Sequence, residues 1–111
     1  MVMSPPSRRA LYRVVYPLSE RPLLTIGRVV HEVVDCSEEG LRYETRGSTL
    51  PVIGSQMRGV VRFHGERTSM IHGEVIRAAR GIVVLALDPP LSFADIMAEQ
   101  RYLRGKGYLR E

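Results

Sequence analysis

The sequence contains no tryptophan, one lysine and one cysteine among its 111 residues. The single cysteine, Cys36, cannot form an internal disulfide, and no second cysteine is present to complete a zinc ribbon or a redox pair. No apolar run approaches the roughly 20 residues that a membrane-spanning helix needs, and the first residues have no hydrophobic stretch typical of a secretory signal. These absences predict a cytoplasmic protein without membrane insertion.

Catalytic and metal-binding patterns are also missing. The histidines, His31, His64 and His72, are not spaced from one another or from carboxylates like a helical metal pair, and no Gly-x-Ser-x-Gly or Walker sequence occurs. His31 lies within a predicted strand and His72 directly before Gly73, so we expect both to be ordinary surface or half-buried residues. We therefore expect no enzymatic activity, no metal and no cofactor.

Arginine, by contrast, is abundant. Of the 16 basic residues all but Lys106 are Arg, and the net charge is +4. Arginine offers a planar fork of donors that suits phosphate oxygens and the guanine edge, and it stacks on flat rings. The bias favours a phosphorylated or nucleotide ligand. GC-rich coding, which replaces Lys by Arg everywhere, is an alternative cause.

The length of the chain predicts one compact domain, over residues 8–111. Residues 1–7 contain two prolines, two serines and no periodic pattern, which indicates a flexible N-terminal arm. About six short strands with turn signals between them follow, at 23–26, 29–34, 40–45, 54–63, 69–77 and 82–87. This pattern predicts an all-β antiparallel barrel or sandwich over about 20–88.

A C-terminal helix is predicted over about 92–104. Ser92 is its expected N-cap, with Asp95 three residues later in a variant of the capping box, and Gly105 and Gly107 should end it. The apolar residues fall near one face and the polar ones mostly on the other: Phe93, Ile96, Met97 and Leu103 against Glu99, Gln100, Arg101 and Arg104. The apolar face can close an end of the barrel or dock on a partner.

Two short motifs carry the functional prediction. Residues 9–13 spell RxxxR, with Arg8 in front, at the point where the predicted arm meets the domain. Residues 35–40 spell DxSxxG at the junction of two predicted strands. Each motif alone is weak, because arginine pairs arise by chance in an Arg-rich chain and Asp-x-Ser is common in turns. Their combination in this order is more specific.

With these motifs the sequence resembles the PilZ family, in which RxxxR precedes a strand, DxSxxG follows it, and a six-stranded antiparallel split barrel is followed by a helix. The resemblance covers almost the whole chain, since 60–62 and 73–78 look like later strands and 92–106 looks like the terminal helix. It implies a single-domain bacterial receptor for cyclic di-GMP. The residues that it implies for ligand binding are Arg8, Arg9, Arg13, Asp35, Ser37, Gly40 and Arg77.

The chemistry of cyclic di-GMP, with its two phosphates and two guanines, agrees with this assignment. Arg9 and Arg13 can each donate to guanine O6 and N7 or to phosphate oxygens. Asp35 can accept from guanine N1–H and N2–H or orient one of those arginines, and Ser37 adds a donor or acceptor. Gly40 either adopts a positive φ or lets the ligand approach the backbone.

The resemblance also implies two cyclic di-GMP molecules per chain, because Arg8 occupies the place of a basic residue that accompanies an intercalated ligand dimer. Arg77 either stacks on a guanine or is an ordinary outward-facing strand residue. An arm that contains Arg8, Arg9 and Arg13 would be mobile without ligand and fold over the nucleotide against the face that bears Asp35 and Ser37. The changed surface would then be presented to an unidentified downstream protein.

Two other functions stay open. One is a nucleotide-independent interaction module of the PilZ type, in pilus assembly or motility, against which the intact motifs argue. The other is a small barrel that binds RNA or single-stranded DNA, which the shortage of aromatic residues in strand positions disfavours.

Overall fold

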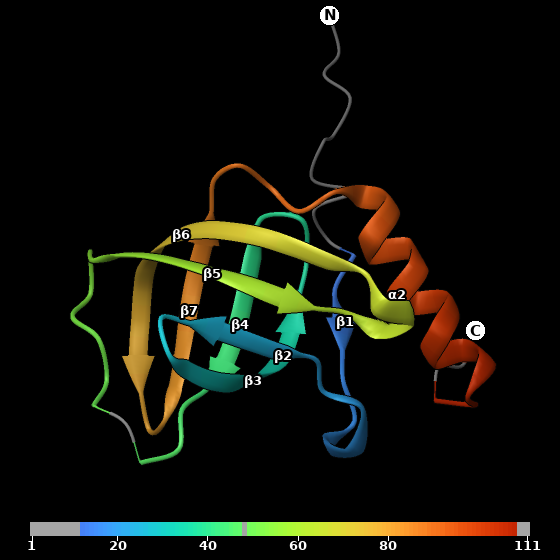
Figure 1. Ribbon diagram of the computed structural model, residues 1–111, viewed down its shortest axis with the longest axis horizontal. Helices are drawn as coiled ribbons and strands as arrows, with labels where there is room; N and C mark the ends of the chain where they lie inside the picture. The colour runs from blue at the N-terminus through green and yellow to red at the C-terminus, as the bar shows by residue number, and fades with distance from the viewer. Residues whose placement is uncertain (1–11, 48, 109–111) are drawn as a thin grey trace, which may run out of the picture.

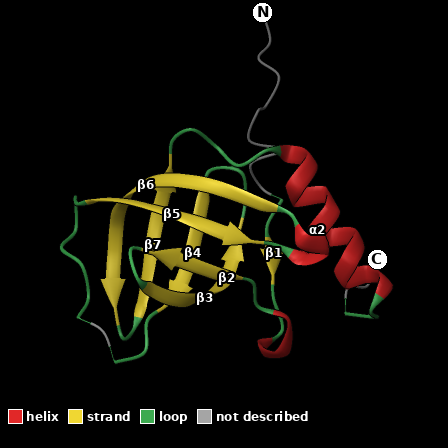
Figure 2. Ribbon diagram, in the orientation of Figure 1, coloured by secondary structure: helices red, strands yellow, loops and turns green. Residues whose placement is uncertain are grey.

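The computed structural model describes residues 12–47 and 49–108, which form a closed six-stranded antiparallel barrel, one further short strand and a C-terminal helix (Figures 1 and 2). This architecture confirms the predicted fold class. The predicted arm, residues 1–7, lies outside the described residues. The elements are β1 (Val14–Val15), η1 (Leu18–Glu20), β2 (Leu23–Ile26), β3 (Val29–Cys36), β4 (Gly40–Glu44), β5 (Gln56–Arg62), η2 (His64–Glu66), β6 (Thr68–Ala79), β7 (Ile82–Leu87) and α2 (Phe93–Gly105).

The barrel closes because β3 pairs with both β2 and β4. Around the ring the order is β3, β2, β5, β6, β7 and β4, and every neighbouring pair is antiparallel. The additional strand β1 runs along the end of β3, with Val14 opposite Cys36 and Val15 opposite Asp35. Closure of the ring leaves its strands without free edges.

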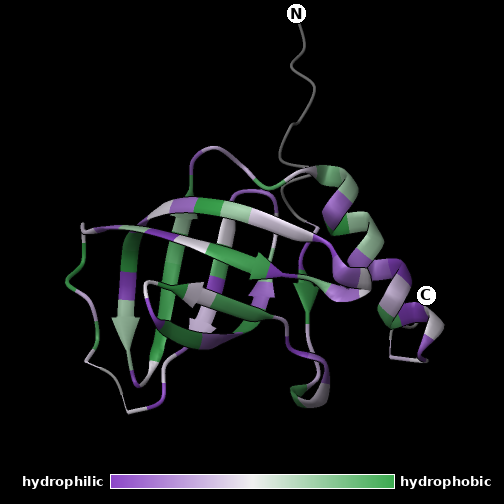
Figure 3. Ribbon diagram, viewed as in Figure 1, coloured by the Kyte–Doolittle hydropathy of each residue, from purple (hydrophilic) through white to green (hydrophobic). Residues whose placement is uncertain are grey.

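Alternation along the strands builds the core. Hydrophobic and hydrophilic segments alternate along the barrel strands in Figure 3, because successive side chains point to opposite faces. At one level of the barrel the inward residues of β1, β3, β4, β7 and β6 lie side by side and none is more than 1% exposed: Val14, Cys36, Leu41, Leu85 and Val75. These residues form the centre of the apolar core.

Two glycines allow neighbouring strands to approach one another closely. A Cβ atom on Gly59 would lie 2.7 Å from the Thr25 carbonyl oxygen, and one on Gly73 would lie 2.7 Å from the Ala86 carbonyl oxygen. A larger residue at either position would force β2 or β7 away from its neighbour, so both glycines are needed for the close approach of these strands.

Helix α2 packs beside β1 at one end of the barrel (Figure 1). It begins as predicted, since the Ser92 hydroxyl oxygen accepts a hydrogen bond from the Asp95 backbone N–H at 3.0 Å. Ile96 and Leu103 are fully buried under it. The predicted placement of Glu99 on the polar face is wrong, because Glu99 is fully buried among donors from the barrel. No helix in the described part of the chain is long and apolar enough to cross a membrane.

Candidate functional site

Asp35 faces the outside of the barrel because of a β-bulge. Strict alternation from the buried Val33 would turn Asp35 into the core. The register between β3 and β4 shifts at Val34, so that Asp35 pairs with the exposed Arg42, and Cys36 takes the next inward position. The extra residue therefore places the carboxylate of the DxSxxG motif on the outer face.

A second bulge acts in the same way on β6. Val75 points into the core, and alternation alone would send Arg77 there too. The register between β6 and β7 shifts at Ile76, and Arg77 is exposed and pairs with Val84. Arg77 therefore points outward, which agrees with both alternatives for this residue, a side chain that stacks on a guanine or an ordinary strand residue.

The two bulges complete a row of side chains across four strands. Asp35 on β3 pairs with Arg42 on β4, Arg42 pairs with Val84 on β7, and Val84 pairs with Arg77 on β6. These four residues are called the outer row below. At about 4.8 Å between neighbouring strands, the outer row extends for about 14 Å.

Asp35 is the buried charge of the outer row. Its Oδ1 accepts a hydrogen bond from Arg13 Nη1 at 2.7 Å, and its Oδ2 lies 3.7 Å from Arg42 Nε. The Asp35 side chain is only 6% exposed, whereas the side chains of Arg13 and Arg42 are 43% and 46% exposed. One carboxylate thus orients two arginines whose other N–H groups face solvent, where they can bind phosphate or a guanine edge.

Arg13 is held in place through its neighbours in the chain. The Tyr12 ring lies against Phe93 at the start of α2, with 5.8 Å between ring centroids. The Tyr16 backbone N–H donates to the Val34 carbonyl at 3.1 Å, and the Tyr16 hydroxyl donates to Glu99 at 2.7 Å. The segment that carries Arg13 is therefore held between α2 and the bulge of β3, contrary to the expectation that Arg13 belongs to a mobile arm.

Ser37 and Gly40 close the turn between β3 and β4. The backbone N–H of Ser37, which is buried, donates to the Gly40 carbonyl at 2.8 Å. Gly40 does not have a positive φ, so that explanation of the glycine is wrong. A Cβ atom there would lie 3.7 Å from Ser37 Oγ and from the Leu85 carbonyl oxygen, an ordinary contact distance. Close approach of a ligand remains the predicted reason for Gly40.

The structure thus brings Arg13, Asp35 and Arg77 onto one face, with Ser37 and Gly40 in the adjoining turn. Arg8 and Arg9 lie outside the described residues. Arg42 was missed from the sequence. Alternation within 40–45 marks it as outward-facing, but only the pairing register places it opposite Asp35.

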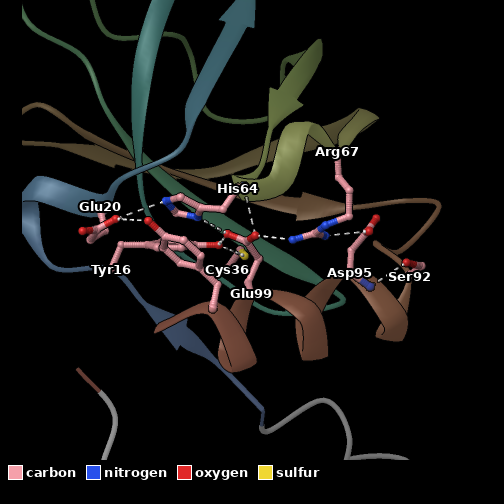
Figure 4. Close-up of polar contacts among 9 residues, drawn as sticks. Tyr16, Glu20, Cys36, His64, Arg67, Ser92, Asp95 and Glu99 are labelled. Atoms are coloured by element: carbon pink, nitrogen blue, oxygen red, sulfur yellow. Dashed lines mark hydrogen bonds and ion pairs between the residues drawn. The ribbon is translucent and has the colours of Figure 1, made fainter. Parts of the chain in front are cut away.

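A second polar cluster lies beneath α2 (Figure 4). Glu99 accepts hydrogen bonds from the Tyr16 hydroxyl at 2.7 Å, from the His64 backbone N–H at 3.1 Å and from Arg67 Nη2. His64 Nδ1 lies 2.9 Å from Glu99 Oε1, and Arg67 Nη1 also donates to Asp95 at 3.0 Å. These contacts define the Glu99 cluster, which consists of Tyr16, His64, Arg67 and Glu99. The Glu99 cluster connects α2 to the barrel through η2 and through Tyr16, which directly follows β1.

The Glu99 cluster adjoins the buried thiol of Cys36. Cys36 Sγ lies 3.8 Å from the Tyr16 hydroxyl oxygen. Burial raises the pKa of the Cys36 thiol to about 12, and burial, with Cys36 and Glu99 close by, raises the pKa of the Tyr16 hydroxyl. Both groups are neutral near pH 7, so this cluster does not present a reactive thiolate.

The other histidines differ in their surroundings. His31 is buried with its ring 4.8 Å from that of Tyr43, and burial lowers its pKa, so the expectation of a surface or half-buried residue is wrong for His31. His72 is half-buried as expected, with Nδ1 3.1 Å from the Asp88 carbonyl oxygen. Within residues 12–47 and 49–108, no three His, Cys, Asp or Glu residues are grouped so that they could hold a metal ion.

No protein-family model and no curated protein sequence matches the chain. Solved structures share its fold, among them the following two. An uncharacterized Legionella protein is 16% identical with a TM-score of 0.62, and the match covers 87% of this chain and 98% of that one. The Bacillus subtilis inhibitor of motility, MotI/DgrA, is 17% identical with a TM-score of 0.61, over 88% of this chain and 50% of that one. This chain therefore spans about half the length of MotI/DgrA, and at these identities the two likenesses show the fold alone.

Proposed function

We propose that this protein is a non-enzymatic receptor that binds cyclic di-GMP on the outer row and signals to another protein. The observation that carries the proposal is the arrangement around Asp35: one buried carboxylate holds Arg13 and Arg42, and Arg77 lies two strands beyond Arg42 on the same face. This arrangement concentrates arginine donors on a small area of the barrel.

The chemistry of these groups suits a guanine dinucleotide. Asp35 already orients Arg13, so the remaining guanidinium N–H groups of Arg13 can donate to guanine O6 and N7 or to a phosphate. Arg42 and Arg77 add cations along the row that can neutralise a second phosphate or stack on a base. Ser37 and Gly40 border the row and allow the ligand to approach the turn.

The sequence supports the same ligand, because the RxxxR and DxSxxG motifs are both intact and resemble those of the PilZ family. Two ligand molecules per chain are expected, since Arg8 precedes RxxxR. Motility is one candidate output, because MotI/DgrA, which shares the fold, is an inhibitor of motility.

Isothermal titration calorimetry with cyclic di-GMP tests the proposal, with GTP and cyclic di-AMP as control ligands. We expect binding of cyclic di-GMP alone, with two molecules per chain. Loss of one charged hydrogen-bonding group costs about 1.5 to 3 kcal/mol, so Arg13→Ala should weaken binding about tenfold to a hundredfold, and Arg9→Ala/Arg13→Ala further.

Arg46→Ala is the matched control variant. Arg46 is also exposed and also pairs with a carboxylate, Glu32, at 3.3 Å, but it lies outside the outer row. The Arg46→Ala variant should bind cyclic di-GMP with the same affinity as the unmodified protein. If no nucleotide produces heat or a shift in Tm, the receptor proposal is wrong, and a nucleotide-independent interaction module takes its place.

The proposal includes ordering of the N-terminal arm over the bound nucleotide. Hydrogen exchange in residues 1–7 should slow when cyclic di-GMP is added, because ordered amides are protected. Equal exchange rates with and without ligand would reject the ordering of the arm, but they would not contradict the proposed binding site.

A further inference from the structure

A groove of about 570 Å³ crosses the outer face of β2, β5 and β6. Val30, Thr25, Val60 and Met70 lie side by side across β3, β2, β5 and β6, and Thr25, Val60 and Met70 line the groove. The three apolar members of this line, Val30, Val60 and Met70, are 56%, 41% and 83% exposed. They are called the apolar row below. Large apolar side chains in adjacent exposed positions are typical of a protein-binding surface.

The groove lies on a different side of the barrel from Asp35. In the closed ring, β2 and β5 are separated from β4 and β7 by β3 on one side and β6 on the other. Figure 1 shows β2 and β5 passing across β4 and β7 in the same view. A molecule in the groove would therefore leave Asp35 and Arg42 free.

Two arginines bracket the apolar row on β5. Arg58 and Arg62 stand two residues before and after Val60, on the same outward face, about 7 Å away on either side. Both are exposed, and neither forms an ion pair with a residue that the structure describes. The neighbouring carboxylate of Glu32 is already paired with Arg21 and Arg46. The groove thus combines an apolar centre with the positive charge of Arg58, and Arg62 adds a second positive charge beside the groove on the same face of β5.

We propose that this groove binds an extended, acidic segment of a partner protein with the pattern acidic-x-apolar-x-acidic. In an extended chain, residues i, i+2 and i+4 point to one side and span about 13 Å, which is the spacing of Arg58, Val60 and Arg62 themselves. The central apolar side chain inserts beside Val60 and Met70, and the two carboxylates pair with Arg58 and Arg62. This interaction does not depend on nucleotide binding.

Selection from a displayed library of random 12-residue peptides tests the inference on the full chain. Peptides are selected on the unmodified protein and counter-selected against Met70→Ser/Arg58→Glu. We expect the enriched peptides to share the acidic-x-apolar-x-acidic pattern. Fluorescence anisotropy with a labelled enriched peptide should then show at least about tenfold weaker binding to each single variant, Met70→Ser and Arg58→Glu, because each removes one component of the site.

Two control variants match these changes in chemistry and exposure. Val52→Ser alters another exposed aliphatic side chain in a loop, and Arg101→Glu reverses an exposed charge on α2. Both should bind the peptide like the unmodified protein. Circular dichroism melting of all four variants confirms that each one folds.

Three results would overturn the inference. The first is the absence of any enriched peptide that depends on Met70 and Arg58. The second is enrichment of basic or neutral peptides. The third is that the protein binds no peptide but cosediments with phosphatidylglycerol vesicles, and that Met70→Ser abolishes this cosedimentation. That result would make the groove a lipid-binding surface.

Discussion

Asp35 and Glu99 are both buried carboxylates, but their partners differ. Glu99 is completely buried and its donors come from three places in the chain: the Tyr16 hydroxyl, the His64 backbone and Arg67. Asp35 relies on Arg13 and Arg42, whose side chains remain close to half exposed. The first carboxylate holds two parts of the fold together, whereas the second one holds cations at the surface.

The difference shows how a buried charge can be identified as structural or functional. A buried ion stabilises a fold only when its hydrogen bonds are satisfied inside the protein, and then its removal leaves buried donors without partners. Arginines held by a carboxylate at the surface can instead exchange solvent for a ligand at little cost. The two regions are also connected, since Tyr16 of the Glu99 cluster lies three residues after Arg13.

Glu99→Ala should have the largest effect on stability. The change leaves the Tyr16 hydroxyl and the His64 backbone N–H without their acceptor, and it leaves Arg67 with Asp95 alone. Each buried donor left unpaired costs about 1 to 3 kcal/mol, so the free energy of unfolding should fall by about 3 to 5 kcal/mol. Urea denaturation measures the free energy of unfolding. Asp35→Ala should lower it by only about 1 kcal/mol, because Arg13 and Arg42 return to solvent. Equal losses in the two variants would contradict the comparison.

Asp35→Asn should have its main effect on ligand binding. The amide is nearly the same size but no longer holds Arg13 by charge, so the affinity for cyclic di-GMP should fall about tenfold to a hundredfold. Glu32→Gln is the matched control, because Glu32 also lies on β3 and also pairs with two arginines, Arg21 and Arg46. Calorimetry should show unchanged affinity for it. Equal weakening by both changes would show a general electrostatic effect.

Much of the barrel could be predicted from local patterns. The six barrel strands follow alternation, and the turn predicted at Arg80-Gly81 has positive φ angles of 56° and 81°, as a two-residue hairpin turn requires. Ser92 caps α2 through a hydroxyl suited to that position. Strand β1 was missed because two residues carry no periodicity and depend on pairing with β3.

The two carboxylates mark where sequence analysis was insufficient. The motif identified Asp35, but Arg42 became part of the site only through the bulge at Val34, which changes the face of every later residue on β3. Glu99 lies three residues after Ile96 and four before Leu103, on the side of α2 that faces the barrel, and only its polar character led to the prediction of an exposed residue. Its burial depends on donors from Tyr16 and η2, which are distant in the sequence.

Alkaline pH should destabilise the Glu99 side of the molecule. The pKa of Cys36 is raised from 9.0 to about 12 in the folded protein, and that of Tyr16 is raised from 10.0. Because the unfolded chain loses these protons first, the stability they contribute is complete below about pH 9 and is lost as the pH rises toward 12. Each group adds a slope of up to about 1.4 kcal/mol per pH unit.

Urea denaturation at several pH values between 8 and 11 measures this slope. Cys36→Ala and Tyr16→Phe should each reduce it, because each removes one of the titrating groups. A free energy of unfolding that stays constant over this range in the unmodified protein would show that the thiol and the hydroxyl are not held in their neutral forms.

Gly40→Ala should give the smallest change in stability and sharpens the functional side of the comparison. Because φ at Gly40 is not positive and the added Cβ would meet its neighbours at 3.7 Å, the free energy of unfolding should change by less than about 1 kcal/mol. The methyl group would nevertheless stand in the path of a ligand that approaches the turn beside Asp35. Calorimetry should therefore show weaker binding of cyclic di-GMP at nearly unchanged Tm, whereas full affinity in this variant would mean that the ligand stays clear of the turn.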